Sequence, residues 1–255
     1  MRIFTELIDN PNNEFWIWNK RITNNSSGRV YPSRTTNVGS GVSVAVYQKN
    51  DQENNAIQIA QLQLPDYDKL KRFYTMGKVV NLDYTYIDNF SWLGTKKPYE
   101  VEGSPFDEHE SISIQCSILN GSDQNDYIHI MHSEINKEDL VFSYSGFFDI
   151  KLDITGLTIQ QGNIDFSYAH FYQSEIAISD TICKGNRSFS SEVSFRYISA
   201  ISSNFDAMLM SQRLSIDFLD AKTENSSANL DPYPYGFHEI TFTGATFAYS
   251  APTER

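Results

Sequence analysis

The stretches that decide the fold are FSYSGFFDIKLDIT (142–155), FSYAHFYQSEIAIS (166–179) and FSSEVSFRYISAIS (189–202). Each copy opens with Phe-Ser and closes with an isoleucine followed by a hydroxyl residue, so the copies start 24 and 23 residues apart. Turn signals, Gln-Gln-Gly-Asn and Lys-Gly-Asn, separate the copies. Repeats of this length are typical of the coils of a solenoid or of successive strands of a β-meander.

Alternation within the copies indicates strands, because successive side chains of a strand point to opposite faces. In the third copy, Phe189, Val193 and Phe195 fall on one side, and Glu192 and Arg196 fall on the other. We therefore expect an all-β fold, namely an antiparallel β-sandwich or barrel with long strands and at most one or two short helices. The alternative is a β-solenoid over residues 140–220.

The same alternation predicts which side chains form the core, since a slip of one residue would exchange the two faces of a strand. The side chains expected to be buried are Phe166, Ile178, Val193, Phe195, Ile201, Met210, Ile216 and Phe218. Those expected to be exposed are Glu192, Arg196, Arg213 and Asp217.

The rest of the chain divides at a long polar loop. Asp66 can cap a short helix that runs through Leu70 to Gly77. Segments 112–118 and 127–131 read as a hairpin. The loop at 91–107 is longer than most connections in compact domains. It suggests an N-terminal β-rich portion at 1–94 and a β-repeat portion at 108–255, or one continuous domain.

Composition bounds the possible partners. The chain has 255 residues, 17 Phe and 15 Tyr, which is enough hydrophobic area for a globular core. The net charge is −12, and no basic cluster longer than a pair occurs, so we expect no nucleic-acid partner.

Residues 1–20 lack the basic start and apolar run of a signal peptide, which predicts synthesis in the cytosol, followed by release or assembly into a particle. The two cysteines, Cys116 and Cys183, are too few for a disulfide scaffold, and buried free thiols are expected.

No metal, cofactor or catalytic site is expected. His129 and His132 are three apart, which puts them on opposite faces of a strand. The acidic run at 107–110 lacks the spaced oxygen ligands and the glycine of a calcium loop. Asp123, Asn125 and Asp126 come nearer to such a loop, but an Asx-rich hairpin tip is favoured, because these side chains bond their own turn backbone. The chain also lacks a Gly-x-Ser-x-Gly elbow, although a glycosidase or hydrolase whose residues are scattered along the sequence stays an alternative.

Exposed aromatic rings are the remaining candidates for a ligand site, because they can stack on sugar rings. The candidates are Trp16, Trp18, Trp92, Tyr233 and Tyr235. Trp16 and Trp18 would share one face of an extended strand.

These observations favour a non-enzymatic assembly or binding protein, such as a phage-tail-type or other particle component, that acts as a homo-oligomer. Long strands leave edges that must be paired or covered. The charge of −12 should hold subunits apart, so assembly should strengthen with salt. The alternatives are a β-pore-forming toxin of the insecticidal type, for which a membrane is the partner, and a carbohydrate-binding module.

Overall fold

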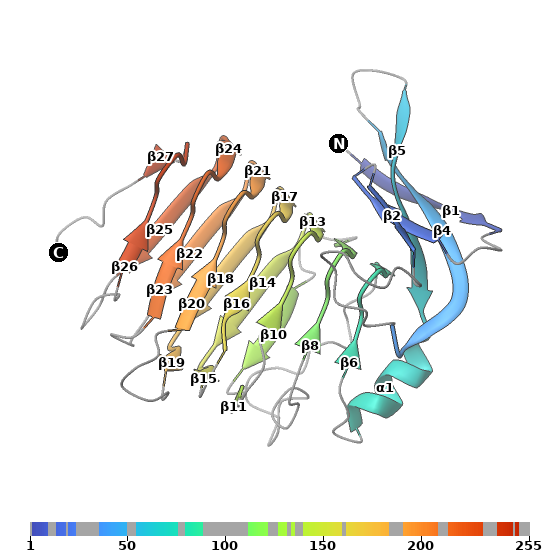
Figure 1. The fold of residues 1–255 in the computed structure, drawn as a ribbon, viewed down its shortest axis with the longest axis horizontal. Helices are drawn as coiled ribbons and strands as arrows, with labels where there is room; N and C mark the ends of the chain where they lie inside the picture. The colour runs from blue at the N-terminus through green and yellow to red at the C-terminus, as the bar shows by residue number, and fades with distance from the viewer. Residues whose placement is uncertain are drawn as a thin grey trace.

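The computed structural model describes residues 2–9, 14–18, 20–23, 36–49, 55–75, 80–88, 112–121, 127–131, 134–135, 140–159, 162–183, 191–208, 214–231, 239–246 and 248–249. Within these residues the chain is nearly all β, which confirms the all-β prediction. Figure 1 shows an antiparallel sheet at one end and a long stack of parallel coils that runs away from it.

The N-terminal sheet has the strand order β1-β4-β5-β2-β3, and all its neighbours are antiparallel. Its strands are β1 (Arg2–Ile8), β2 (Glu14–Ile17), β3 (Lys20–Thr23), β4 (Gly39–Lys49) and β5 (Ala56–Pro65). Val44 and Val46 lie opposite Leu62 and Ala60, and all four side chains are buried, so this face of the sheet packs inward.

The predicted helix is present as α1 (Tyr67–Thr75). The Lys69 amide donates to Asp66 Oδ1 at 3.0 Å, so Asp66 caps the first turn as the sequence predicts. Leu70 is fully buried and joins the solenoid core next to Val80 and Leu82. The helix therefore covers the end of the first coil.

The rest of the described chain is a β-solenoid with four faces, each a parallel sheet. Face 1 consists of β6 (Val80–Asn81), β8 (Ile112–Ser113), β12 (Leu140–Val141), β16 (Ile164–Asp165), β20 (Ser191–Ser194), β23 (Leu214–Asp217) and β26 (Glu239–Thr241). Face 2 consists of β7 (Tyr86–Ile87), β9 (Ile118–Asn120), β13 (Gly146–Phe148), β17 (His170–Tyr172), β21 (Ser199–Ile201) and β24 (Lys222–Glu224).

Face 3 consists of β10 (Tyr127–Met131), β14 (Lys151–Thr155), β18 (Glu175–Ser179), β22 (Asn204–Met208), β25 (Ser227–Asp231) and β27 (Ala248–Tyr249). Face 4 is short, with β11 (Glu134–Ile135), β15 (Thr158–Ile159) and β19 (Ile182–Cys183). Each strand pairs with the equivalent strand of the next coil, for example Leu152 with Ile176 and Ile176 with Phe205.

The corner between faces 1 and 2 has the same geometry in every described coil. Its third residue has a positive φ of 52–72°, and this residue is Tyr84, Cys116, Tyr144, Tyr168, Tyr197, Asp220 or Gly244. At the first six of these positions, the amide of this residue donates to a carbonyl of the following coil, as from Tyr168 to Arg196 at 2.9 Å. The strained backbone is thus held in place by bonds between coils.

Stacked phenylalanines fill the core behind this corner. Phe166 lies between Phe142 and Phe195, with centroid distances of 4.8 and 4.9 Å and nearly parallel rings. The stack continues through Phe218 to Phe242. Equivalent residues of successive coils therefore touch directly, as strand spacings near 4.8 Å require.

The sequence predicts a β-solenoid over 140–220 as the alternative fold, and the structure has this arrangement. The solenoid is longer than predicted and extends from Val80 to Tyr249. The repeat strands pair in parallel, so this part is not an antiparallel sandwich or barrel. The strands are also short, because each copy of the repeat contains two corners. The register of the third copy differs from the one that the sequence match predicts: Phe166 stacks on Phe195, and Phe189 lies outside the described residues.

Burial follows the prediction for six of the expected core side chains and departs from it at Ile201 and Asp217, and Glu192 and Arg196, expected to be exposed, are half-buried. The side chains confirmed as buried are Phe166, Ile178, Val193, Phe195, Ile216 and Phe218. Ile201 is 37 % exposed, because the corner at Tyr197 shifts the alternation by one residue and turns Ala200 inward. Asp217 points away from the core but is buried beneath the Arg196 side chain. Met210 and Arg213 lie outside the described residues.

The predicted hairpin is wrong, since β8, β9 and β10 belong to three different faces of one coil. The loop 91–107, on which the division into two portions rests, lies outside the described residues, and the first coil begins before it at Val80. The division itself stays a prediction. Cys116 and Cys183 are both buried and form no disulfide, as expected.

The N-terminal sheet joins the solenoid through a second core on the outer side of face 2. Phe15, Ile17 and Val46 pack there with Tyr86 and Phe148. Strand β5 also bridges the first coil, because the Gln63 amide donates to the Tyr84 carbonyl at 2.9 Å. The sheet and α1 together close the N-terminal end of the solenoid (Figure 1).

Candidate interaction surface

Exposed apolar side chains gather on the N-terminal sheet. Among the described residues, ten large hydrophobic side chains are exposed, and four of them belong to this sheet: Phe4, Leu7, Val42 and Ile57. Leu7 is 74 % exposed and Ile57 is 65 % exposed. The exposed side chains lie on both faces of the sheet, Phe4 on one and Leu7 and Ile57 on the other, and exposed apolar side chains of this kind make the sheet a candidate interaction surface.

Strand register explains why Leu7 and Ile57 are exposed. Leu7 lies opposite Val44, and Ile3 and Ile57 both lie opposite Gln48, so they share the face that packs inward elsewhere. The Val44 side chain is buried in the second core, whereas Leu7 lies on the edge strand. The inward face of the sheet therefore extends past the solenoid that covers its centre.

The opposite face of the sheet carries aromatic rings. Phe4 stacks on Tyr47 of the neighbouring strand, with centroids 5.3 Å apart and planes 12° apart. Trp16 is half-buried, and its Nε1 donates to Gln61 Oε1 at 3.1 Å. Gln61 in turn donates to the Glu14 carbonyl. Trp16 thus keeps its place among the candidates for stacking on a ligand.

Trp18 lies in a different environment. Strand β2 ends at Ile17, and Trp18 has a φ of 51°, so the alternation that would place it beside Trp16 is broken. Its ring packs on His170 at 4.2 Å, and its Nε1 donates to the Tyr144 carbonyl at 3.3 Å. Trp18 therefore joins the sheet to the solenoid. Trp92, Tyr233 and Tyr235 lie outside the described residues.

Gly146 makes room for this junction. A Cβ atom at Gly146 would lie 2.7 Å from the Trp18 ring and 2.8 Å from the Phe148 ring. His170 is enclosed by the same contact, and burial lowers its pKa to about 4. A neutral imidazole is thus part of the junction at neutral pH.

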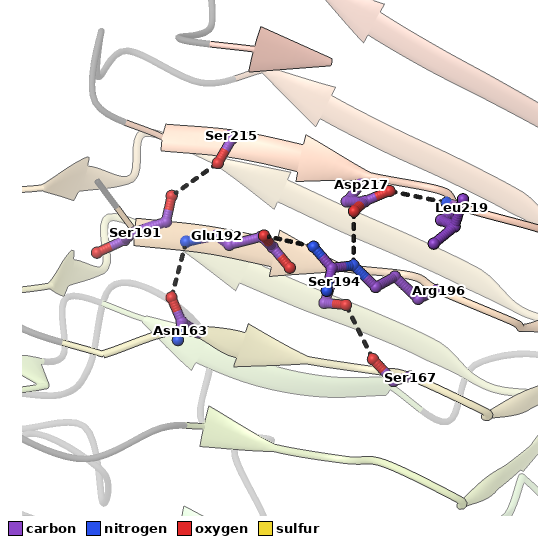
Figure 2. Close-up of polar contacts among 9 residues, drawn as sticks. All are labelled: Asn163, Ser167, Ser191, Glu192, Ser194, Arg196, Ser215, Asp217 and Leu219. Carbon is purple, nitrogen blue, oxygen red and sulfur yellow. Dashed lines mark hydrogen bonds and ion pairs between the residues drawn. The ribbon is translucent and has the colours of Figure 1, made fainter. Parts of the chain in front are cut away.

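A polar network lies on the outer side of face 1 (Figure 2). Arg196 Nε donates to Asp217 Oδ2 at 2.5 Å, and Arg196 Nη2 lies 3.1 Å from Glu192 Oε2. The bond to Asp217 raises the pKa of Arg196, and burial raises the pKa of Glu192. The guanidinium is therefore bonded within the protein, and the network joins β20 to β23.

Tyrosines form a second outward feature at the corner beside this network. Tyr168 lies between Tyr144 and Tyr197, with a centroid distance of 4.8 Å on each side. The rings face one another, so mainly their edges meet solvent. This ladder stabilises the coil stack and leaves little ring face for a ligand.

Within the described ranges, no group of three or more His, Cys, Asp or Glu side chains could hold a metal ion. His129 lies on β10, and His132 lies outside the described residues. In the same part of the chain, no helix has the length and apolar character needed to span a bilayer.

Comparison of the chain with protein-family models, with curated proteins and with solved structures gives no match in any of the three. Function therefore has to be inferred from the geometry of the chain itself.

The sequence contains a signal for β1 that is not among the expectations above. RIFTELI at 2–8 alternates Arg2, Phe4 and Glu6 with Ile3, Thr5 and Leu7. This is the pattern of a strand with one apolar face. Its position at the edge of the sheet cannot be predicted from this pattern, because alternation shows the faces of a strand and not its neighbours.

Proposed function

We propose that this protein is a non-enzymatic assembly and binding protein that works as a homo-oligomer, such as a particle component. The observation that supports the proposal is the set of exposed apolar side chains on the N-terminal sheet, with Leu7 and Ile57 most exposed. Burial of apolar area is the main driving force for most protein association. An edge strand in the same sheet adds backbone groups that can pair.

Light scattering across a salt series, with and without liposomes, tests the proposal. The charge of −12 repels like subunits, so the average mass should exceed that of the monomer and rise with salt in the absence of lipid. Oligomers that form only with liposomes, together with dye release, would instead support a pore-forming toxin. A monomer at every salt concentration would contradict the proposal.

A carbohydrate-binding module is the second candidate, and Trp16 is the observation that favours it. Its indole lies on the face of the sheet that carries the Phe4–Tyr47 stack, close to the Gln61 amide. Aromatic faces beside polar amides suit sugar rings. Titration of soluble oligosaccharides should quench tryptophan fluorescence in the native protein and in W18F, but not in W16F. Equal quenching in W16F would reject this site.

A further inference from the structure

Strand β1 forms the outer edge of the N-terminal sheet. On one side it pairs with β4 over its whole length, from Arg2 opposite Lys49 to Ile8 opposite Ser43. On the other side no strand of the described chain pairs with it. An edge of this length presents a row of N–H and C=O groups to any strand that can pair with them.

The charges on β1 are unbalanced within one copy of the chain. Arg2 lies directly opposite Lys49, and like charges at such positions are unfavourable. Glu6 lies opposite Ala45, which offers it no charge. Both Arg2 and Glu6 are exposed, and neither makes an ion pair with a described residue. Arg2 therefore lacks a nearby negative charge among the described residues, and Glu6 lacks a nearby positive charge. Each of the two side chains could supply the charge that the other lacks.

These charges become complementary when β1 meets a second β1. We propose that β1 pairs in antiparallel fashion with β1 of a second copy, about a two-fold axis at Phe4. Phe4 then lies opposite Phe4 of the second copy, and each Arg2 lies opposite the other copy's Glu6. This inference rests on the proposed function, since it names the surface through which the homo-oligomer forms.

Symmetry and register support this arrangement. Arg2, Phe4 and Glu6 alternate along the strand and so share a face, as cross-strand partners must. Two identical patches related by a two-fold axis give a closed dimer, and the two five-stranded sheets become one continuous sheet. An axis at Thr5 would instead place Phe4 opposite Glu6 and leave Arg2 opposite Ile8.

Charge exchange tests the pairing. Arg2→Glu and Glu6→Arg each turn two attractive cross-strand pairs into repulsive ones, so each should raise the dimer dissociation constant by about tenfold or more at low ionic strength. The double variant restores both pairs and should return the constant to within about threefold of the native value. Matched controls are Lys222→Glu and Glu224→Arg, which make the same charge changes at exposed positions of β24.

Sedimentation equilibrium gives the constants, and circular dichroism confirms that each variant is folded. A native chain that stays monomeric would overturn the proposed function and this inference together. A native oligomer whose constant is the same in all the variants would overturn only the pairing through β1.

Cross-linking tests the register separately. Phe4→Cys places two thiols directly opposite one another at the axis, within the Cα separation that a disulfide needs. Oxidation should therefore join the Phe4→Cys chains in pairs, and Thr5→Cys should cross-link much less. The opposite result would move the axis to Thr5 and overturn the Arg2–Glu6 pairing.

Discussion

At the scale of the residue, tyrosines adopt a backbone that usually favours glycine. Tyr84, Tyr144, Tyr168 and Tyr197 all have φ near 60° at the same corner. The left-handed conformation costs about 1–2 kcal/mol for a residue with a Cβ. Ring stacking and a backbone bond to the next coil offset this cost. The left-handed backbone of these tyrosines could not be predicted from sequence, because tyrosine ordinarily favours strands.

Protonation of His170 should loosen the junction between the sheet and the solenoid. Its pKa of about 4 lies below the usual value near 6.5, so the folded state favours the neutral imidazole. The contribution of the neutral His170 to the unfolding free energy is therefore fully present above pH 6.5 and is lost as the pH falls towards 4. The loss should reach about 3 kcal/mol of unfolding free energy near pH 4.

Denaturant unfolding at pH 7 and pH 5 measures this effect against the variant His170→Phe, which keeps a ring against Trp18 but cannot be protonated. The comparison is needed because burial raises the pKa of Asp149, Glu192 and Asp206, whose contributions to stability have the opposite sign. The native protein should lose more stability than the variant over this interval. Equal losses would show that His170 is not the sensitive group.

At the scale of the element, sequence predicted the type of structure better than the pairing. The helix could be predicted because its cap and its apolar face are local signals, Asp66 and Leu70. Strand partners depend on residues a full coil away, so parallel pairing left no local signal. The corners do have a local sequence signal, which is a phenylalanine followed three positions later by an alanine. Examples are Phe166 with Ala169 and Phe218 with Ala221.

The hydrogen bond that caps α1 should contribute measurably to the stability of the protein. Asp66→Ala removes the acceptor for the Lys69 amide and should lower the unfolding free energy by about 0.5–2 kcal/mol. Asp66→Asn is the matched control, since asparagine caps nearly as well and should change stability much less. Both values can be obtained from urea denaturation. Similar losses in the two variants would mean that the charge of Asp66 matters rather than its capping bond.

At the scale of the whole molecule, the two ends of the solenoid differ. Leu70 and Val38 cover the first coil, and Val80 and Leu82 are almost completely buried beneath them. At the other end, Ile240 pairs with the buried Ile216 but is itself 38 % exposed. Among the described residues, the last coil thus has a neighbour that covers its core on one side only. This asymmetry could not be predicted from the repeats, which look alike along the chain.

The asymmetry predicts that the solenoid opens from its C-terminal end. In a stack of coils, stability is close to a sum over neighbouring pairs, and a coil with one neighbour has the least. Two amides at the same corner position allow a direct comparison. The Phe142 amide donates to the Asp165 carbonyl at 2.7 Å in the middle of the stack, and the Phe218 amide donates to the Thr241 carbonyl at 2.8 Å between the last two described coils.

Hydrogen exchange under conditions that keep the chain monomeric measures this difference. Both amides belong to buried phenylalanines with bonds of similar length, so local geometry alone predicts similar protection. Opening from the C-terminal end should instead make the Phe218 amide exchange at least about tenfold faster than the Phe142 amide. Equal rates would mean that the solenoid unfolds as one cooperative unit, and faster exchange at Phe142 would place the weak point at the junction with the N-terminal sheet.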